Sequence, residues 1–150
     1  MKINEIMTKD VICVKEDTPI LEIAEIVSGK KIHGVPVVDE NDKVVGIITE
    51  TDFFTKDSSN MVYMPSMIDF IKKGKMNYPE GEEEKEALGE IIHAKARDIM
   101  TPKCETVSPD LEVEDFIKII KEKSFNSYQV VDEEGVLVGM ITVADAIKLL

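Results

Sequence analysis

Two short phrases of the chain carry the residues best suited to chemistry. Each has the pattern Gly-x-Ile-Thr-x-x-Asp, and Asp52 closes the first while Asp145 closes the second. An ionised carboxylate can accept two hydrogen bonds from a vicinal diol, such as that of a ribose. Thr49 and Thr142 stand where a helix is expected to begin, and a helix start offers backbone donors and positive potential to a phosphate. The alternative is that each Thr and Asp only cap the following helix.

The two phrases belong to a repeat that covers both ends of the chain. When the sequence is shifted against itself, Met7-Thr8 falls on Met100-Thr101 and the match continues without a gap to Asp52 on Asp145. The run Val-Val-Asp-Glu recurs inside it, at 37–40 and at 130–133. Two copies of one unit indicate a duplicated module with paired sites rather than a single active-site pocket.

Composition limits the classes of function. The 150 residues are 43% apolar, enough to bury a core shared by two similar halves. No apolar run approaches the roughly 20 residues that span a bilayer, and the start lacks the apolar stretch of a signal peptide, so we expect a cytoplasmic protein without membrane association. The formal charge of −12 repels phosphate backbones, so no nucleic-acid partner is expected.

The first copy predicts a strand over 11–17 and a helix that begins at Thr18-Pro19 and stops near Gly29. Ile20, Ile23, Ala24 and Val27 recur at helical spacing and are its expected core face. Two Val/Ile-rich strands follow over 34–40 and 43–50, joined by a turn at 40–42, and a helix is expected to start after Thr49.

The second copy repeats this order. Strands are expected over 104–108, 128–133 and 136–142, with a helix starting at Pro109-Asp110 and a closing helix over 144–150. Strand, helix, strand, strand, helix in each half predicts an α+β fold of two units packed about a pseudo-twofold axis.

The middle of the chain has no counterpart in the repeat. We expect a first domain over 1–55, an insert over 56–95 and a second domain over 96–150. In the insert, 61–75 has an apolar stripe typical of a packed helix, and the acidic stretch that follows is expected to be solvated.

The duplicated motifs resemble a known family. The pattern MT…VSPD…PVVDE…GIIT..D, found twice, resembles the cystathionine-β-synthase (CBS) domain pair, or Bateman module, and only the insert lies outside the resemblance. The resemblance implies a non-catalytic regulatory module that senses energy or metabolite state. It would bind AMP, ADP, ATP or S-adenosylmethionine in clefts between two CBS domains, without an obligatory cofactor. It also implies a homodimer and a regulated partner protein.

The resemblance assigns the ribose to Asp52 and Asp145, with Thr49 and Thr142 at ribose or phosphate. His33 stands where related proteins often carry a cationic residue facing phosphate, the alternative being an ordinary surface or strand histidine, and Lys103 lies in the loop expected to cover the first site. That site is expected to contain Ile32, His33, Gly34, Val35, Pro36, Ile47, Thr49, Thr51, Asp52, Met100, Thr101 and Lys103.

The second site departs from the first, because Asn126 replaces the histidine, Gln129 the proline and Ala144 the Thr51 position. Asp10 in its covering segment is unfavourable to phosphate, so the site is expected to stay empty or take a less charged adenosine compound. Its expected residues are Thr8, Asp10, Ile12, Phe125, Asn126, Tyr128, Met140, Thr142 and Asp145. Phe125 or Tyr128 would stack on a base, the alternative for both being a place in the core.

Two other classes of function remain open. One is a divalent-cation (Mg²⁺) sensor that uses the acidic insert, although no ordered oxygen-ligand spacing is present. The other is a structural dimerisation module whose sites are degenerate. Catalysis is not expected, because the chain lacks a recognisable nucleophile motif, a Walker or Rossmann glycine motif and zinc-ligand spacing.

Overall fold

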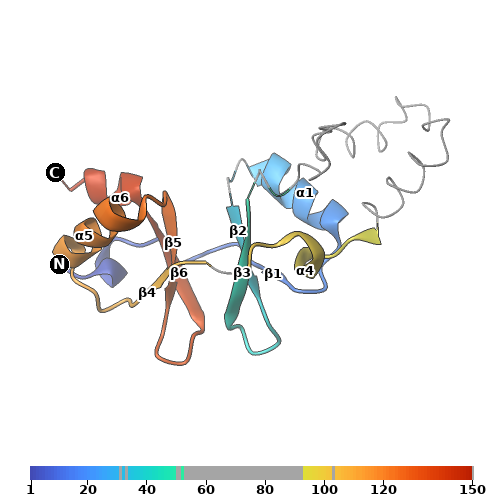
Figure 1. The fold of residues 1–150 in the computed structure, drawn as a ribbon, viewed down its shortest axis with the longest axis horizontal. Helices are drawn as coiled ribbons and strands as arrows, with labels where there is room; N and C mark the ends of the chain where they lie inside the picture. Colours follow the sequence, from blue (N-terminus) through green and yellow to red (C-terminus); the bar gives the residue numbers. More distant parts are fainter. Residues whose placement is uncertain (31, 33, 50–51, 53–92, 103, 150) are drawn as a thin grey trace. The chain divides into compact units, whose positions relative to one another are not determined.

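A computed structural model describes residues 1–30, 32, 34–49, 52, 93–102 and 104–149 (Figure 1). The first half contains a 3₁₀ helix η1 (Ile3–Glu5), β1 (Val14–Lys15), α1 (Ile20–Lys30), β2 (Gly34–Val38) and β3 (Val44–Thr49). The second half contains α4 (Ala96–Ile99), β4 (Thr106–Val107), α5 (Val113–Lys123), β5 (Ser127–Val131), β6 (Leu137–Thr142) and α6 (Val143–Ile147). The strands form two three-stranded sheets, ordered β1-β2-β3 and β4-β5-β6. The predicted α+β class is confirmed.

The chain divides into two compact units that mix the two copies. The β4–β6 unit contains Met1–Cys13, Val38–Gly46 and Pro102–Leu150, whereas the β1–β3 unit contains Val14–Val37 and Ile47–Thr101. We call the segment that leads into each copy its leading segment, which is 1–13 for the first copy and 93–101 for the second. Each leading segment belongs to the unit that holds the strands of the other copy. The domain boundaries expected near 55 and 95 adjoin residues 53–92, which lie outside the described part of the chain, and stay predictions.

The β4–β6 sheet combines parallel and antiparallel pairing. β4 pairs parallel with β5, with Thr106 opposite Gln129. β5 pairs antiparallel with β6, with Gln129 opposite Met140 and Tyr128 opposite Ile141. Directly opposite residues point to the same face of a sheet, so this register decides which side chains enter the core.

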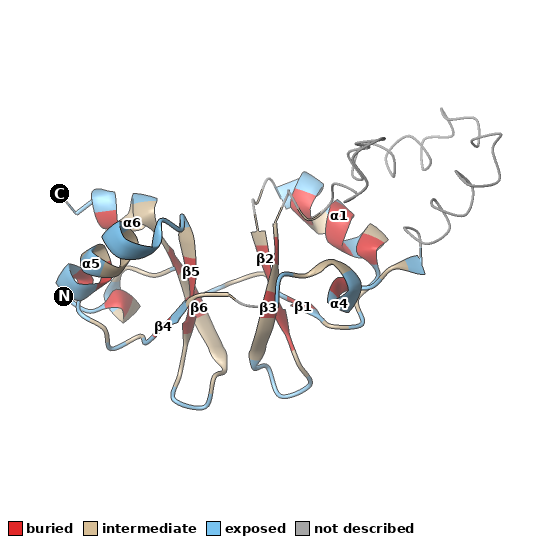
Figure 2. Ribbon diagram, viewed as in Figure 1, coloured by how far each residue is buried: buried red, intermediate tan, exposed pale blue. Residues whose placement is uncertain are grey.

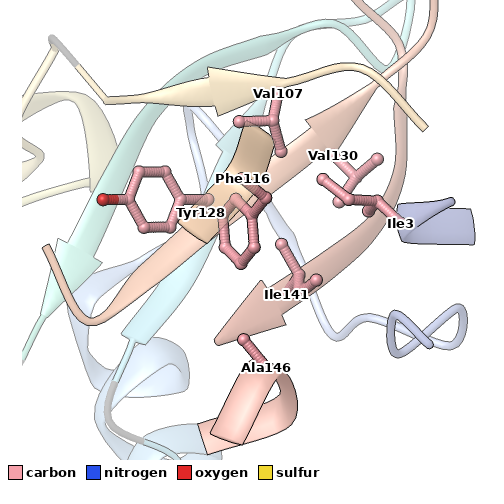
Figure 3. Close-up of a cluster of buried hydrophobic side chains, with 7 residues drawn as sticks. All are labelled: Ile3, Val107, Phe116, Tyr128, Val130, Ile141 and Ala146. Atoms are coloured by element: carbon pink, nitrogen blue, oxygen red, sulfur yellow. The ribbon is translucent and has the colours of Figure 1, made fainter. Parts of the chain in front are cut away.

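An aromatic pair lies at the centre of the β4–β6 unit (Figure 3). Phe116 from α5 meets Tyr128 from β5 edge to face, with ring centroids 5.1 Å apart, and both side chains are fully buried. Such a pair contributes about 0.5–1.5 kcal/mol beyond the area it buries. The rest of the cluster comes from η1, β4, α5, β5, β6 and α6 and includes Ile3, Val107, Val130, Ile141 and Ala146.

The β1–β3 unit buries one face of α1, visible in Figure 2. Ile20, Ile23, Ala24 and Val27 are all buried, as the helical spacing predicts. Val35 and Val37 of β2 and Ile48 of β3 are buried completely as well. Ala96 of α4 joins the buried residues, and its backbone N–H donates to the Thr18 carbonyl at 2.9 Å, which ties the start of α4 to the loop before α1.

Several element ends differ from the predictions. The first strand covers Val14–Lys15 rather than 11–17. Thr18 does not cap α1, because its hydroxyl accepts the Lys15 N–H at 3.0 Å in the preceding turn, and α1 continues past Gly29 to Lys30. α5 begins at Val113 instead of Pro109-Asp110.

The helix α6 also ends earlier than predicted, at Ile147 rather than at 150. Residues just before and after a helix compete for its terminal backbone groups, which sequence periodicity does not resolve.

Both hairpin turns are held by an aspartate. Asp39 accepts the N–H groups of Asn41 and Lys43 at 2.8 and 3.0 Å, and Asp132 does the same for Glu134 and Val136 at 2.9 and 3.0 Å. These are Asx-type turns, in which the side chain satisfies the backbone donors of a tight bend. The predicted hairpins are thus closed by equivalent residues of the two copies.

Gly139 of β6 is required by a close approach rather than by its backbone angles. A Cβ at this position would lie 2.6 Å from Met7 Sδ and 2.9 Å from the Thr8 carbonyl oxygen. We therefore expect Gly139→Ala to lower the free energy of unfolding by about 1–3 kcal/mol, measured by urea denaturation, because the backbone of the leading segment must move.

Gly29→Ala is the matched control for this substitution. Apart from its chain neighbours and the backbone of α1, no atom of the described residues lies within 4 Å of a Cβ at Gly29, so alanine should be neutral or raise the free energy of unfolding by up to about 1 kcal/mol. Equal stability of the Gly139→Ala chain and the wild type would contradict the close approach.

Candidate functional site

In the β1–β3 unit, the end of β3 positions Thr49 beside Asp52. The backbone N–H of Thr49 donates to Asp52 Oδ2 at 2.8 Å and its hydroxyl donates to the same oxygen at 3.2 Å. The hydroxyl of Thr101 donates to the other oxygen, Oδ1, at 3.3 Å. Thr101 is held there because its backbone pairs with Ile47 through two hydrogen bonds of 2.8 and 3.0 Å. A threonine of the second copy thus meets the carboxylate of the first.

In the β4–β6 unit, Thr142 and Asp145 have the same arrangement at the start of α6. The Thr142 N–H and hydroxyl donate to Asp145 Oδ2 at 2.9 and 2.7 Å, and the Asp145 N–H donates to the Thr142 hydroxyl at 3.2 Å. This reciprocal pair is a capping box. Asp145 Oδ1 instead accepts the Lys148 ammonium at 3.3 Å.

The leading segment is held in this unit as in the other. Thr8 and Met140 exchange two backbone hydrogen bonds, each of 2.9 Å. Thr8 is the repeat equivalent of Thr101, and Met140 that of Ile47. The repeat relation therefore extends from the sequence to backbone pairing.

Capping and ligand binding use different edges of the carboxylate. In both units Oδ2 accepts the hydrogen bonds from the threonine backbone and hydroxyl, while among the described residues Oδ1 accepts one hydrogen bond, at the long distance of 3.3 Å. Each carboxylate oxygen has two lone pairs, so Oδ1 can accept a further hydroxyl. The two readings of Asp52 and Asp145, cap and ligand contact, are thus compatible.

The helix after the second phrase is short. α6 has five residues, so its dipole offers little to a phosphate. The described part of the β4–β6 unit therefore favours recognition of a diol more than of a charged tail.

The hydrogen bonds around Asp145 control its ionisation. Partial burial alone would raise the pKa of this carboxyl, but the hydroxyl and backbone N–H of Thr142, together with the Lys148 ammonium, outweigh burial and leave the pKa below its ordinary value. Asp145 is consequently ionised throughout the neutral range and can accept hydroxyl hydrogen bonds there.

The lowered pKa predicts an acid-sensitive contribution to stability. A carboxyl with a depressed folded-state pKa stabilises the fold above its unfolded pKa of about 3.9, and this stabilisation is lost as the pH falls through the folded value. Asp145→Asn should therefore lower the free energy of unfolding by about 1 kcal/mol from pH 5 to 8, and the difference from the wild type should shrink below about pH 4.

Urea denaturation at a series of pH values measures this difference, with the exposed Asp17→Asn as control. A difference that grows toward acid would contradict the assignment.

The structure distributes the other expected residues of the first site among core, strand and loop. Val35 is fully buried in the core, so its side chain does not face solvent. Gly34, Pro36 and Ile47 lie on β2 and β3, Ile32 precedes β2, and Met100 follows α4. His33, Thr51 and Lys103 lie outside the described residues, so their expected roles stay predictions.

In the second site, Tyr128 is also fully buried, which favours the core alternative for its ring. Phe125 is 50% exposed and meets the Tyr128 ring edge to face at 6.3 Å, so it remains a candidate to stack on a base. Asn126 is exposed, and its carbonyl accepts the Val143 N–H at 3.0 Å, beside the start of α6. Asp10 is exposed and Ile12 half-buried in the leading segment.

Gln129 was not among the expected site residues. It is the buried polar residue of the described chain, with 1% of its surface exposed, and among those residues its Nε2 has no hydrogen-bond partner. The sequence carried a signal for it, because a glutamine interrupts the apolar strand at the position where the first copy has Pro36.

Neither a metal centre nor a membrane span emerges from the described residues. In that part of the chain no three His, Cys, Asp or Glu side chains lie close enough to share an ion. Across the same ranges, no helix has the length and apolarity that crossing a bilayer requires. The acidic insert lies outside these ranges, so the cation-sensing alternative stays a prediction.

A family model for the CBS domain matches residues 3–58 and again residues 96–150. The chain belongs to the CBS domain family. The resemblance predicted from the duplicated motifs is thereby confirmed, and the two matches adjoin an unmatched insert. This CBS pair is 32% identical to an uncharacterized protein of Methanocaldococcus jannaschii, and the alignment covers all of this chain and 91% of that protein.

The CBS pair also matches parts of larger proteins. An inosine-5'-monophosphate dehydrogenase of Methanocaldococcus jannaschii is 28% identical over 98% of this chain, yet only 23% of the enzyme is covered. The match is confined to that part of the enzyme, so it carries the CBS pair and not the activity of the whole enzyme.

Solved structures share the fold. The CBS domain of a membrane protein from Sphaerobacter thermophilus is 27% identical, with a TM-score of 0.74 and coverage of 100% of this chain and 88% of that one. CBSX2, a CBS-pair protein from Arabidopsis thaliana, was solved in complex with AMP; it is 23% identical, with a TM-score of 0.69 and coverage of 99% and 94%.

The CBS domain pair of protein MJ0100 was solved with 5'-methylthioadenosine and S-adenosyl-L-methionine. It is 23% identical, with a TM-score of 0.65 and coverage of 99% and 94%. Both of these CBS pairs were thus solved with small adenosine compounds.

Proposed function

We propose that this CBS pair is a regulatory module that binds adenosine-containing ligands, with Asp52 and Asp145 accepting the ribose hydroxyls. The proposal rests on the hydrogen bonds of each carboxylate. Oδ2 accepts the capping bonds, whereas Oδ1 accepts only a long hydrogen bond of 3.3 Å among the described residues. The AMP, methylthioadenosine and S-adenosylmethionine complexes of similar CBS pairs support the ligand class.

The two sites should differ in the charge they accept. The first has a neutral hydroxyl, that of Thr101, on Asp52 Oδ1, and is the site to which the sequence assigns His33 and Lys103. In the second site, the Lys148 ammonium is paired with Asp145 Oδ1, and Asp10 in the leading segment adds a carboxylate that is unfavourable to phosphate. We infer that AMP, ADP or ATP binds at the first site and that the second favours an adenosine compound with little negative charge.

Calorimetric titration tests this function. We expect AMP, ADP, ATP or S-adenosylmethionine to release or absorb heat on binding to the wild-type chain. Asp52→Ala should weaken nucleotide binding about 10- to 100-fold, because a charged hydrogen-bond acceptor is lost. Asp17→Ala, an exposed aspartate, is the control and should bind as the wild type does. Absence of heat for all four compounds with folded protein would refute the proposal.

We further propose that the module forms a homodimer and transmits its ligand state to a partner protein. A ligand shifts such an arrangement only by binding one conformation more tightly than another. Native mass spectrometry of protein purified without added ligand should show a dimer and the mass of any copurified adenosine compound. A strictly monomeric spectrum at micromolar concentration would contradict the dimer.

A further inference from the structure

One row of side chains crosses a face of the β4–β6 sheet toward Asp145. Thr106 is opposite Gln129, Gln129 is opposite Met140, and Met140 is opposite Thr8. Directly opposite residues share a face, so these four side chains form one row on the sheet. Met7 packs against Gly139 and the core cluster, which is consistent with Thr8 facing the other side.

The repeat relation assigns the Thr8 end of this row to the proposed diol acceptor, Asp145. Thr8 is the repeat equivalent of Thr101, whose hydroxyl donates to Asp52 in the other unit, and Asp145 is the equivalent of Asp52. Gln129 and Thr8 are two strand spacings apart, or about 10 Å. A nucleoside held by its diol at the Thr8 end therefore has its base within reach of Gln129.

Gln129 has an unsatisfied donor in this row. Its side chain is 1% exposed, and within the described residues Nε2 is buried without a hydrogen-bond partner. A buried amide of this kind is costly unless another group accepts from it. Its neighbours Thr106 and Thr8 are exposed and Met140 is half-buried, so the two ends of the row reach solvent while Gln129 itself is covered.

The other copy has no such donor. The repeat equivalent of Gln129 is Pro36, which is buried and lacks both a side-chain donor and a backbone N–H. The equivalent of Met140 is Ile47, which is purely apolar. The second copy therefore has an amide donor at a position where the first copy has an apolar side chain.

We propose that Gln129 is a specificity-determining residue of the second site and that its amide N–H donates to a ring nitrogen of a bound purine. The inference rests on the proposed function, because it takes the ribose of an adenosine compound to lie at Asp145. Ring nitrogens of adenine are acceptors, and a donor that is already buried needs no further desolvation to bind one.

The test uses adenosine and its 1-deaza, 3-deaza and 7-deaza analogues, in each of which one ring nitrogen is replaced by C–H. Calorimetry is performed on the Asp52→Ala chain, so that the second site is measured. One of the three analogues should bind about 10-fold more weakly than adenosine, and the other two should bind about equally well. This comparison keeps Gln129 intact.

Gln129→Met, in the same background, completes a double-mutant cycle. Methionine has nearly the same length but no donor, so adenosine should bind about 10-fold more weakly and the sensitive analogue should lose nothing further. The ligand-free variant should melt at the same or a higher temperature, since the unpaired amide is gone. Lys121→Met, at an exposed position of α5, is the control and should leave this binding unchanged.

Each outcome separates the two hypotheses. Equal binding of all three analogues, or an analogue penalty that persists in Gln129→Met, would overturn the role of Gln129 while leaving the proposed function standing. No binding of any adenosine compound to the wild-type chain would overturn the proposed function and this inference with it.

Discussion

The pairing of each leading segment with the last strand of a sheet is the constraint on which the sites depend. Thr8 exchanges two backbone hydrogen bonds with Met140, and Thr101 does the same with Ile47. The approach is so close at Gly139 that no side chain fits between the strand and Met7. Because backbone pairing fixes the direction of the neighbouring side chains, Thr101 reaches Asp52 although the two residues are far apart in sequence.

A second constraint follows from the geometry of the carboxylates. At both phrases one oxygen satisfies the backbone and hydroxyl donors at the end of a strand, and the other points to a weakly bound partner. The same residue can therefore stabilise the fold and contact a ligand. Preorganisation of this kind lowers the cost of binding, because the acceptor is already held in place by its capping bonds.

Much of the fold follows from local pattern. The Thr-x-x-Asp spacing predicts a capping box since both partners lie within one turn, and that box is present at Thr142 and Asp145. The buried face of α1 follows from helical spacing in the same way. Strand ends and helix starts were less predictable, as at Thr18, whose hydroxyl joins the turn before α1 rather than the helix.

The composition of the sites was only partly predictable. Val35 and Tyr128 occupy strands expected to line the sites, yet both face the core, because register and not residue type decides which alternate positions are buried. Gln129 was identified only as the replacement of the first-site proline, because residue type does not show whether a strand position is buried. A polar residue in an apolar strand reads as a surface position until the sheet shows that it is buried and that its amide, within the described residues, lacks a partner.

The sequence by itself determined the duplication, the family, the α+β class and the pairing of each Thr with its Asp. These features rest on short-range spacing and on repetition, which a single chain displays directly. Only the tertiary structure decided that each compact unit joins segments of both copies, that Thr101 lies on Asp52, and that Gln129 is buried in a row with Met140 and Thr8. Those features depend on strand register and long-range backbone pairing, which residue order alone leaves open.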